Sequence, residues 1–330
     1  MKTRLFVGVQ VTVTSVLVWY LMRGFDWAGF VALFERLPLW FYALSLVSVS
    51  LGQTVYAWRW WIILQAADVR IRFRTVLEEF LVGNFVNTFV PSTVGGDAAR
   101  VYYVGRDHGY RTATATVILD RLLGVGLLAL LALVVMSVAP DPVPAFTATR
   151  AALGVVIGAT VAVLVAAVSG TGGLAGHVGF LGARAVRAAE HLQSVRLDMA
   201  AAVTSPRAML GAASTVVIYF TMLTGIYDIY IRIVLGHAVS FLSLLTTVAV
   251  VALVSNLPVS ISGLGVREQM HVLMLRPLGV PKEEAVAISL LLFATALVTN
   301  MAGGYFWIRR STAPAAAPPP QPEPFLPPHA

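Results

Sequence analysis

Two stretches interrupt the apolar sequence in the same way: Asn84-FVNTFVPSTVGGDAA-Arg100 and Asn256-LPVSISGLGV-Arg267. In both, a proline precedes an arginine by nine positions, with glycines between them. Proline ends a helix because it lacks a backbone N–H group, and glycines permit a tight reversal. Each stretch therefore predicts a helical hairpin that enters a membrane and turns back.

Long apolar segments surround these two breaks. The chain has 330 residues, of which 58% are hydrophobic and 12% are charged, whereas soluble domains carry roughly 25% charged residues. A helix crosses a bilayer with about 20 apolar residues. The segments that are long enough are 5–22, 39–64, 114–138, 152–169, 209–235 and 285–308. We expect an all-α polytopic membrane protein with about six transmembrane helices and two re-entrant helical hairpins.

The order of spans and hairpins predicts an inverted repeat. Two spans precede each hairpin and one follows it, and because three crossings is an odd number the second half is inverted. The first repeat is 1–139, with its hairpin at 76–106, and the second is 140–310, with its hairpin at 241–275. Inverted repeats with broken helices are typical of transporters. We expect residues 311–330, rich in Pro and Ala, to form a disordered tail.

The basic residues predict the orientation. The net charge is +7, and 15 of the 23 Lys and Arg residues fall on the side of both termini. The positive-inside rule then places both termini in the cytoplasm. The connection 170–208 is cytoplasmic in this topology, and its part 182–203 predicts an amphipathic helix on the membrane surface. These basic residues do not form a soluble basic surface of the kind that binds nucleic acid, so we expect no nucleic-acid partner.

The first break carries a charged constellation. Asp97 suits the N-cap of the returning helix, and Arg100 follows one turn later. The N-terminus of a helix beside an arginine is a favourable binding site for an anionic headgroup. Asp120 lies about 9 Å into its span, where ionisable residues are costly and commonly functional. We predict the pairs Asp120–Arg100 and Arg121–Asp97, which bridge hairpin and span; the alternative is a purely structural clasp without a ligand.

The second break follows the same pattern. Gly263 and Gly265 would form the turn, and Arg267 and Glu268 would open the return helix, with His271 interpreted as a packing residue. Together the two breaks give the candidate substrate-binding residues Asn84, Asn87, Gly95, Gly96, Asp97, Arg100, Asp120, Arg121, Asn256, Gly263, Gly265, Arg267 and Glu268. The sequence has no cysteine and no HExxH or P-loop motif, so we expect no metal site and no cofactor.

Other charged residues favour the membrane interface. Arg59, among Trp58, Trp60 and Trp61, is interpreted as a headgroup-level anchor. Asp228 and Arg232, spaced i,i+4, predict an interfacial ion pair. We also place Glu79 at the interface, with a cavity-facing, proton-coupling carboxylate as the alternative.

The segments GNFVNTFVPSTVGGDAARVYY, ILDRLLG and LPVSISGLGVRE resemble the lysylphosphatidylglycerol synthase transmembrane-region family of flippase-like integral membrane proteins. The first signature is similar to N-x6-P-x4-G-D-x2-R followed by an acidic-Arg pair, in which Asp120 stands where Glu is usual. The second is similar to P-x4-G-x-G-x-R-E and is matched by Pro258, Gly263, Gly265, Arg267 and Glu268. The resemblance implies movement of aminoacylated phosphatidylglycerol or of another lipid between leaflets. In bifunctional members the synthase lies in a separate soluble domain, so we do not expect synthase activity here.

Three functions remain open at this point. The first is a lipid flippase or transporter of a bacterial inner membrane, with membrane lipids as its partners. The second is an intramembrane transferase with Asp97 or Glu268 as general base. The third is a non-transporting subunit of a lipid-modification complex, in which a homo-oligomer or a lipid-biosynthesis protein is the partner.

Overall fold

The computed structural model describes residues 2–89, 95–139, 146–169, 193, 195–256, 260 and 263–311. The secondary structure of these ranges is helical throughout, as predicted. The helices are α1 (Lys2–Met22), α2 (Trp27–Arg36), α3 (Leu39–Ala66), α4 (Phe73–Phe89), α5 (Gly95–His108), α6 (Tyr110–Val138), α7 (Phe146–Ser169), α10 (Pro206–Leu235), α11 (Phe241–Ser255), α12 (Val266–Leu275), the 3-10 helix η3 (Arg276–Leu278) and α13 (Lys282–Ser311).

The long helices match the six predicted apolar segments. Five of them, α3, α6, α7, α10 and α13, are long and apolar enough to cross a bilayer. Within the described residues, Gln10–Met22 of α1 and Trp27–Arg36 of α2 pass the same test as a pair, bent by 86°, which brings the number to six. A helix satisfies all of its own backbone hydrogen bonds, as a lipid environment requires. The chain is therefore a multi-pass membrane protein.

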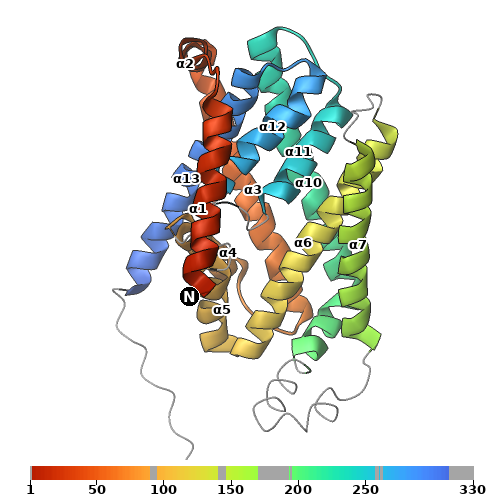
Figure 1. Ribbon diagram of the computed structural model, residues 1–330. Helices are drawn as coiled ribbons and strands as arrows, with labels where there is room; N and C mark the ends of the chain where they lie inside the picture. The colour runs from red at the N-terminus through yellow and green to blue at the C-terminus, as the bar shows by residue number, and fades with distance from the viewer. Residues whose placement is uncertain are drawn as a thin grey trace, which may run out of the picture.

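Helix α2 was not predicted from the sequence. It begins after Asp26, whose carboxylate accepts a hydrogen bond of 3.0 Å from the backbone N–H of Gly29. Gly24, with a φ of +60°, makes the sharp turn that separates α2 from α1. The first apolar segment therefore continues, after this turn, into a second short helix at the end of the bundle (Figure 1).

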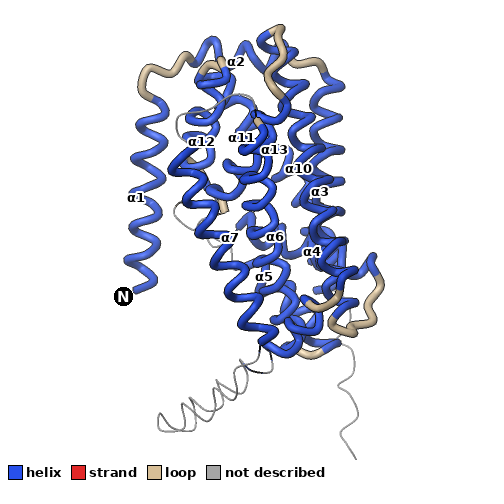
Figure 2. The backbone as a smooth tube through the Cα atoms, turned by 90° about the vertical axis from the view of Figure 1, so that its right-hand side faces the viewer, coloured by secondary structure: helices blue, strands red, loops and turns tan. Residues whose placement is uncertain are grey.

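The two predicted hairpins lie at opposite ends of the bundle. Figure 1 and Figure 2 show α4 and α5 at the end where α1 begins and α13 finishes, and α11 and α12 toward the other end. Helix α4 packs against α5, and α11 packs against α12. An inverted repeat would give this arrangement, and the division of the chain at residue 139 stays a prediction.

Packing between helices that are distant in the sequence holds the first hairpin in place. The largest core cluster joins α10, α11, α6 and α13 and includes Phe220, Tyr230, Leu244 and Ile288. Helix α13 also lies close against α4, because a Cβ on Gly303 would come 2.0 Å from the carbonyl oxygen of Leu81. The first hairpin is thus held by α13, which is far from it in the sequence.

The segment 195–203 differs from its predicted role as a membrane-surface helix. It is helical, but its apolar residues Val195, Met199 and Ala202 are buried against the transmembrane helices. The carboxylate of Asp198 accepts hydrogen bonds from Arg111 and from Thr112 at the start of α6. The apolar face of this segment therefore packs on protein rather than on lipid. Residues 182–192, and the tail from 312, lie outside the described residues.

Candidate functional site

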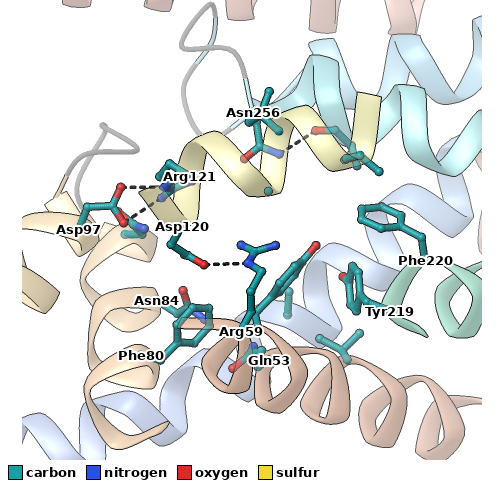
Figure 3. A pocket seen from close by; sticks show the side chains of 18 of the residues that line it. Gln53, Arg59, Phe80, Asn84, Asp97, Asp120, Arg121, Tyr219, Phe220 and Asn256 are labelled. Carbon is teal, nitrogen blue, oxygen red and sulfur yellow. Dashed lines mark hydrogen bonds and ion pairs between the residues drawn. The ribbon is translucent and has the colours of Figure 1, made fainter. Parts of the chain in front are cut away.

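A cavity of about 400 Å³ lies between the first hairpin and the surrounding spans. Figure 3 shows charged side chains from α3, α5 and α6 converging on it. Its polar lining residues are Gln53, Tyr56, Arg59, Asn84, Asn87, Asp97, Arg100, Asp120, Arg121, Tyr219, Asn256 and Asn300. Ionisable groups at this depth are costly unless they are paired, and they commonly mark ion or substrate pathways.

Asp120 is the centre of a buried ion-pair cluster. One carboxylate oxygen, Oδ1, lies 2.7 Å from Nε of Arg59 on α3, and the other, Oδ2, lies 3.1 Å from Nη2 of Arg100 on α5. All three side chains are buried. One carboxylate therefore ties the first hairpin to two transmembrane helices, and the predicted pair Asp120–Arg100 is confirmed.

Asp97 forms the second link between the hairpin and α6. Its Oδ2 lies 2.7 Å from Nε of Arg121, and its Oδ1 lies 3.1 Å from Nη2 of the same guanidinium. Nη1 of Arg100 lies 3.3 Å from Asp97 Oδ1. The predicted pair Arg121–Asp97 is confirmed. The predicted N-cap is wrong, because α5 already begins at Gly95 and Asp97 lies inside its first turn.

Aromatic rings also contact the two buried arginines, Arg59 and Arg100. The guanidinium carbon of Arg100 lies 4.1 Å from the ring centroid of Trp60 and 4.8 Å from that of Phe80. The guanidinium of Arg59 lies 4.9 Å from the ring centroid of Tyr56. Cation–π contacts stabilise a desolvated charge. The interface-anchor interpretation of Arg59 and Trp60 is therefore wrong: both are buried and support the cavity.

The second hairpin has a charged cluster of its own. Glu268 accepts a hydrogen bond of 2.7 Å from the backbone N–H of Gly265, and its other oxygen lies 3.0 Å from Nε of Arg267. Ser289 Oγ donates to the same oxygen of Glu268, 3.2 Å away. The guanidinium of Arg267 lies 4.2 Å from the ring centroid of Phe293. This cluster fixes the start of α12.

His271 is a satisfied packing residue, as predicted. Its Nδ1 donates to the carbonyl oxygen of Arg267 over 2.7 Å, because a carbonyl oxygen only accepts. Its Nε2 then accepts from the hydroxyl of Tyr227 over 2.6 Å. The bond of Nδ1 lies within α12, whereas the bond of Nε2 to Tyr227 holds α12 against α10.

The two hairpins face adjoining cavities rather than a single one. Arg267 lines a second cavity of about 300 Å³, which shares Val49, Tyr219 and Asn256 with the first. The predicted residues Gly263, Gly265 and Glu268 line neither cavity. Gly263 and Gly265 instead form the turn, with φ of +75° and +80°, as predicted. Pro91 and Pro258 lie outside the described residues.

These clusters carry the sequence signatures of one family. A family model described as the lysylphosphatidylglycerol synthase transmembrane region matches residues 7–304. The chain belongs to this family. A UPF0104 membrane protein of Pyrococcus horikoshii is 30% identical over 132 residues, a stretch that covers 38% of this chain and 37% of the relative. The match thus spans little more than a third of that relative's length.

The two glycines of the first break have a different role from the predicted reversal. Gly95 and Gly96 are helical residues of α5, and neither has a positive φ. A Cβ on Gly96 would come 2.2 Å from the carbonyl oxygen of Gly83. The backbone N–H of Gly96 donates to Asn87 Oδ1 over 2.6 Å. Gly96 therefore permits the close contact of α4 with α5.

Carboxamide side chains line the cavity together with the charged residues. The predicted residues Asn84, Asn87 and Asn256 are part of this lining. Sequence reasoning missed Gln53 of α3 and Asn300 of α13, which are joined by a hydrogen bond of 2.9 Å from Gln53 Nε2 to Asn300 Oδ1. A polar residue in the middle of a long apolar span is the signal that would have found both.

Glu79 does not line the cavity. Its carboxylate pairs with the guanidinium of Arg310 at the end of α13, and Glu78 pairs with the same arginine over 3.2 Å. The alternative of a cavity-facing, proton-coupling carboxylate at this position is therefore wrong. Asp228 and Arg232 form the predicted pair, 2.7 Å apart.

Proposed function

We propose that this protein is a lipid flippase or transporter, which moves a lipid with an anionic headgroup between the two leaflets of the membrane. The observation that carries the proposal is the charge of the cavity. Arg59, Arg100 and Arg121 line it together with only two carboxylates, Asp97 and Asp120. The described lining therefore carries one excess positive charge inside a bundle of apolar helices.

This excess charge favours a phosphate group. Guanidinium groups bind phosphate oxygens with directed hydrogen bonds. Asp120 holds Arg59 and Arg100 in place, whereas the side chain of Arg121 is 40% exposed and is the best placed of the three to meet a headgroup. The acyl tails would remain in the lipid outside the bundle, along helix faces rich in exposed residues such as Leu39, Val155 and Leu210.

The path across the membrane uses both hairpins in this proposal. The cavities of the two hairpins adjoin, and the hairpins lie at opposite ends of the bundle (Figure 1). Rocking of one inverted half against the other would open the first cavity to one leaflet and the second cavity to the other. The family's description names lysylphosphatidylglycerol, so an aminoacylated phospholipid is one candidate cargo beside simple anionic phospholipids. A bacterial inner membrane with both termini in the cytoplasm is part of the proposal.

Transport fits the carboxylates better than catalysis does. A general base must be free to take a proton. Asp97, Asp120 and Glu268 each hold a guanidinium group instead.

Reconstitution tests the proposal. The purified protein is placed in vesicles that contain a small amount of headgroup-intact, tail-labelled phosphatidylglycerol or phosphatidylcholine, and an impermeant reductant destroys label in the outer leaflet. The proposal predicts that inner-leaflet phosphatidylglycerol becomes accessible faster than in protein-free vesicles, and faster than phosphatidylcholine. No exchange above protein-free vesicles for anionic or aminoacylated lipids would refute it.

A further inference from the structure

A basic groove lies at the end of the bundle away from the first hairpin. It has a volume of about 580 Å³ and is formed by the end of α1, the outer face of α12, η3 and the start of α13. Its lining includes Arg23, Arg276 and Lys282 beside Tyr20, Leu273 and Pro277. It shares no lining residue with the two cavities described above.

The groove is positively charged without a compensating acid. No Asp or Glu is among its described lining residues. In the described part of the chain, Arg23, Arg276 and Lys282 form no ion pair. The ammonium of Lys282 donates to the carbonyl oxygen of Arg23 over 2.9 Å, which draws these two cations together. Such a cluster attracts anionic headgroups.

Two acids near this groove, Asp26 and Glu283, have other hydrogen-bond partners. Glu283 is next to Lys282 in sequence, but its Oε1 accepts from the backbone N–H of Asp26 over 3.4 Å. The carboxylate of Asp26 in turn caps α2. Both acids are therefore engaged at the α1–α2 turn.

Apart from Gln269, the remaining lining residues are apolar or aromatic. Leu273 and Tyr20 are 55% and 61% exposed, and the guanidinium of Arg23 stacks 4.0 Å from the ring centroid of Trp19. Aromatic rings of this kind gather at the headgroup level of a bilayer. The cationic end and the apolar wall of the groove match the two parts of a phospholipid. The phosphate would lie at the cations, and an acyl chain would lie along Leu273.

Helix α12 separates this groove from the interior. Arg267 and His271 of α12 line the inner cavity, whereas Gln269, Leu273 and, just beyond the helix, Arg276 line the groove. Where α1 crosses α12, a Cβ on Gly265 would come 2.8 Å from the Cβ of Leu17. A ligand in the groove therefore contacts the helix that carries the second charged cluster.

We propose that this groove is a second lipid site, which binds the headgroup of an anionic phospholipid of the bilayer between Arg23, Arg276 and Lys282. It is distinct from the transport cavity and does not depend on transport.

Photocrosslinking tests this site. The full chain is placed in phosphatidylcholine nanodiscs with a small fraction of phosphatidylglycerol that carries a diazirine in one acyl chain, and adducts are mapped by peptide mass spectrometry. We expect adducts on α1 near Tyr20 and on α12 near Leu273. The triple variant Arg23→Gln, Arg276→Gln, Lys282→Gln should lower their yield by about tenfold or more.

A matched control removes three exposed basic residues elsewhere: Arg70→Gln, Arg72→Gln, Arg207→Gln. It should keep the adducts, as should Arg121→Gln in the transport cavity. Should the triple variant not fold, Arg276→Gln alone, at an exposed position of η3, should still lower the yield severalfold. Equal yields in the groove variants and in the wild type would overturn the proposal, as would equal labelling by a phosphatidylcholine probe. Loss of labelling with inorganic phosphate would assign the groove to a soluble anion instead.

Discussion

Arg100 of the first hairpin and Asp120 of α6 lie 3.1 Å apart at their Nη2 and Oδ2 atoms, with side chains only 5% and 3% exposed. The same carboxylate binds Arg59 over 2.7 Å. This burial has an energetic consequence, because two buried guanidinium groups share the Asp120 carboxylate. Arg100 has a further acidic partner in Asp97, 3.3 Å away. The cluster therefore governs both the stability of the first hairpin and the charge of the cavity.

Asp120→Asn should destabilise the protein strongly. The substitution keeps the shape of the side chain but leaves Arg59 and Arg100 buried without their shared carboxylate. Breaking a buried pair in this way costs about 3 kcal/mol or more. The loss is measured as the change in the free energy of unfolding, with the protein in mixed micelles of rising sodium dodecyl sulfate content. The control is Asp107→Asn, whose pair with Arg106 is exposed and should contribute less than about 1 kcal/mol. Equal effects of the two variants would contradict the account.

Gly96→Ala should disturb the packing of α4 against α5. The added Cβ would lie 2.2 Å from the carbonyl oxygen of Gly83, and this backbone atom has to move. Overpacking of this kind costs about 1–3 kcal/mol. In the same unfolding measurement, Gly225→Ala of α10 is the control, because a Cβ there meets nothing within 4 Å. A Gly96→Ala protein as stable as the Gly225→Ala protein would show that the hairpin does not depend on this contact.

Val125→Trp should block transport without unfolding the protein. Val125 lines the cavity and is 38% exposed, so an indole at this position occupies space that a headgroup needs. Val134→Trp on the same helix is the control, at a position 55% exposed that does not line the cavity. Vesicle assays should show exchange at the protein-free level for Val125→Trp and at the wild-type level for Val134→Trp. Wild-type exchange in Val125→Trp would place the path elsewhere.

The spans and the main ion pairs were predictable from the sequence. Long apolar runs identify membrane helices because the bilayer fixes their length. Asp120 and Arg121 could be assigned partners because a charge at this depth needs one. Asp97 and Arg100 are the charges next to the turn of the first hairpin, and both predicted pairs are present.

Other parts of the site depend on how helices rotate and cross. Arg59 lies seven residues before the end of α3, a position that suits an interface anchor as well as an interior residue. Its direction is set by the packing of α3 against α6, which the sequence does not contain. The contact of Gly96 with Gly83 likewise depends on the crossing of α4 and α5. Gln53 and Asn300 come from helices far apart in the chain, and only the fold brings them together.

Leaflet exchange in the Arg121→Gln protein tests the central claim most directly. Of the three arginines that line the cavity, Arg121 has the most exposed side chain, at 40%. Its replacement should therefore weaken headgroup binding more than it lowers the stability of the protein. Arg106→Gln, which removes an exposed charge outside the cavity lining, is the control. The account predicts that Arg121→Gln slows phosphatidylglycerol exchange at least about tenfold, the loss expected when one charged contact is removed, while Arg106→Gln matches the wild type. Unchanged exchange in a folded Arg121→Gln protein would contradict the account.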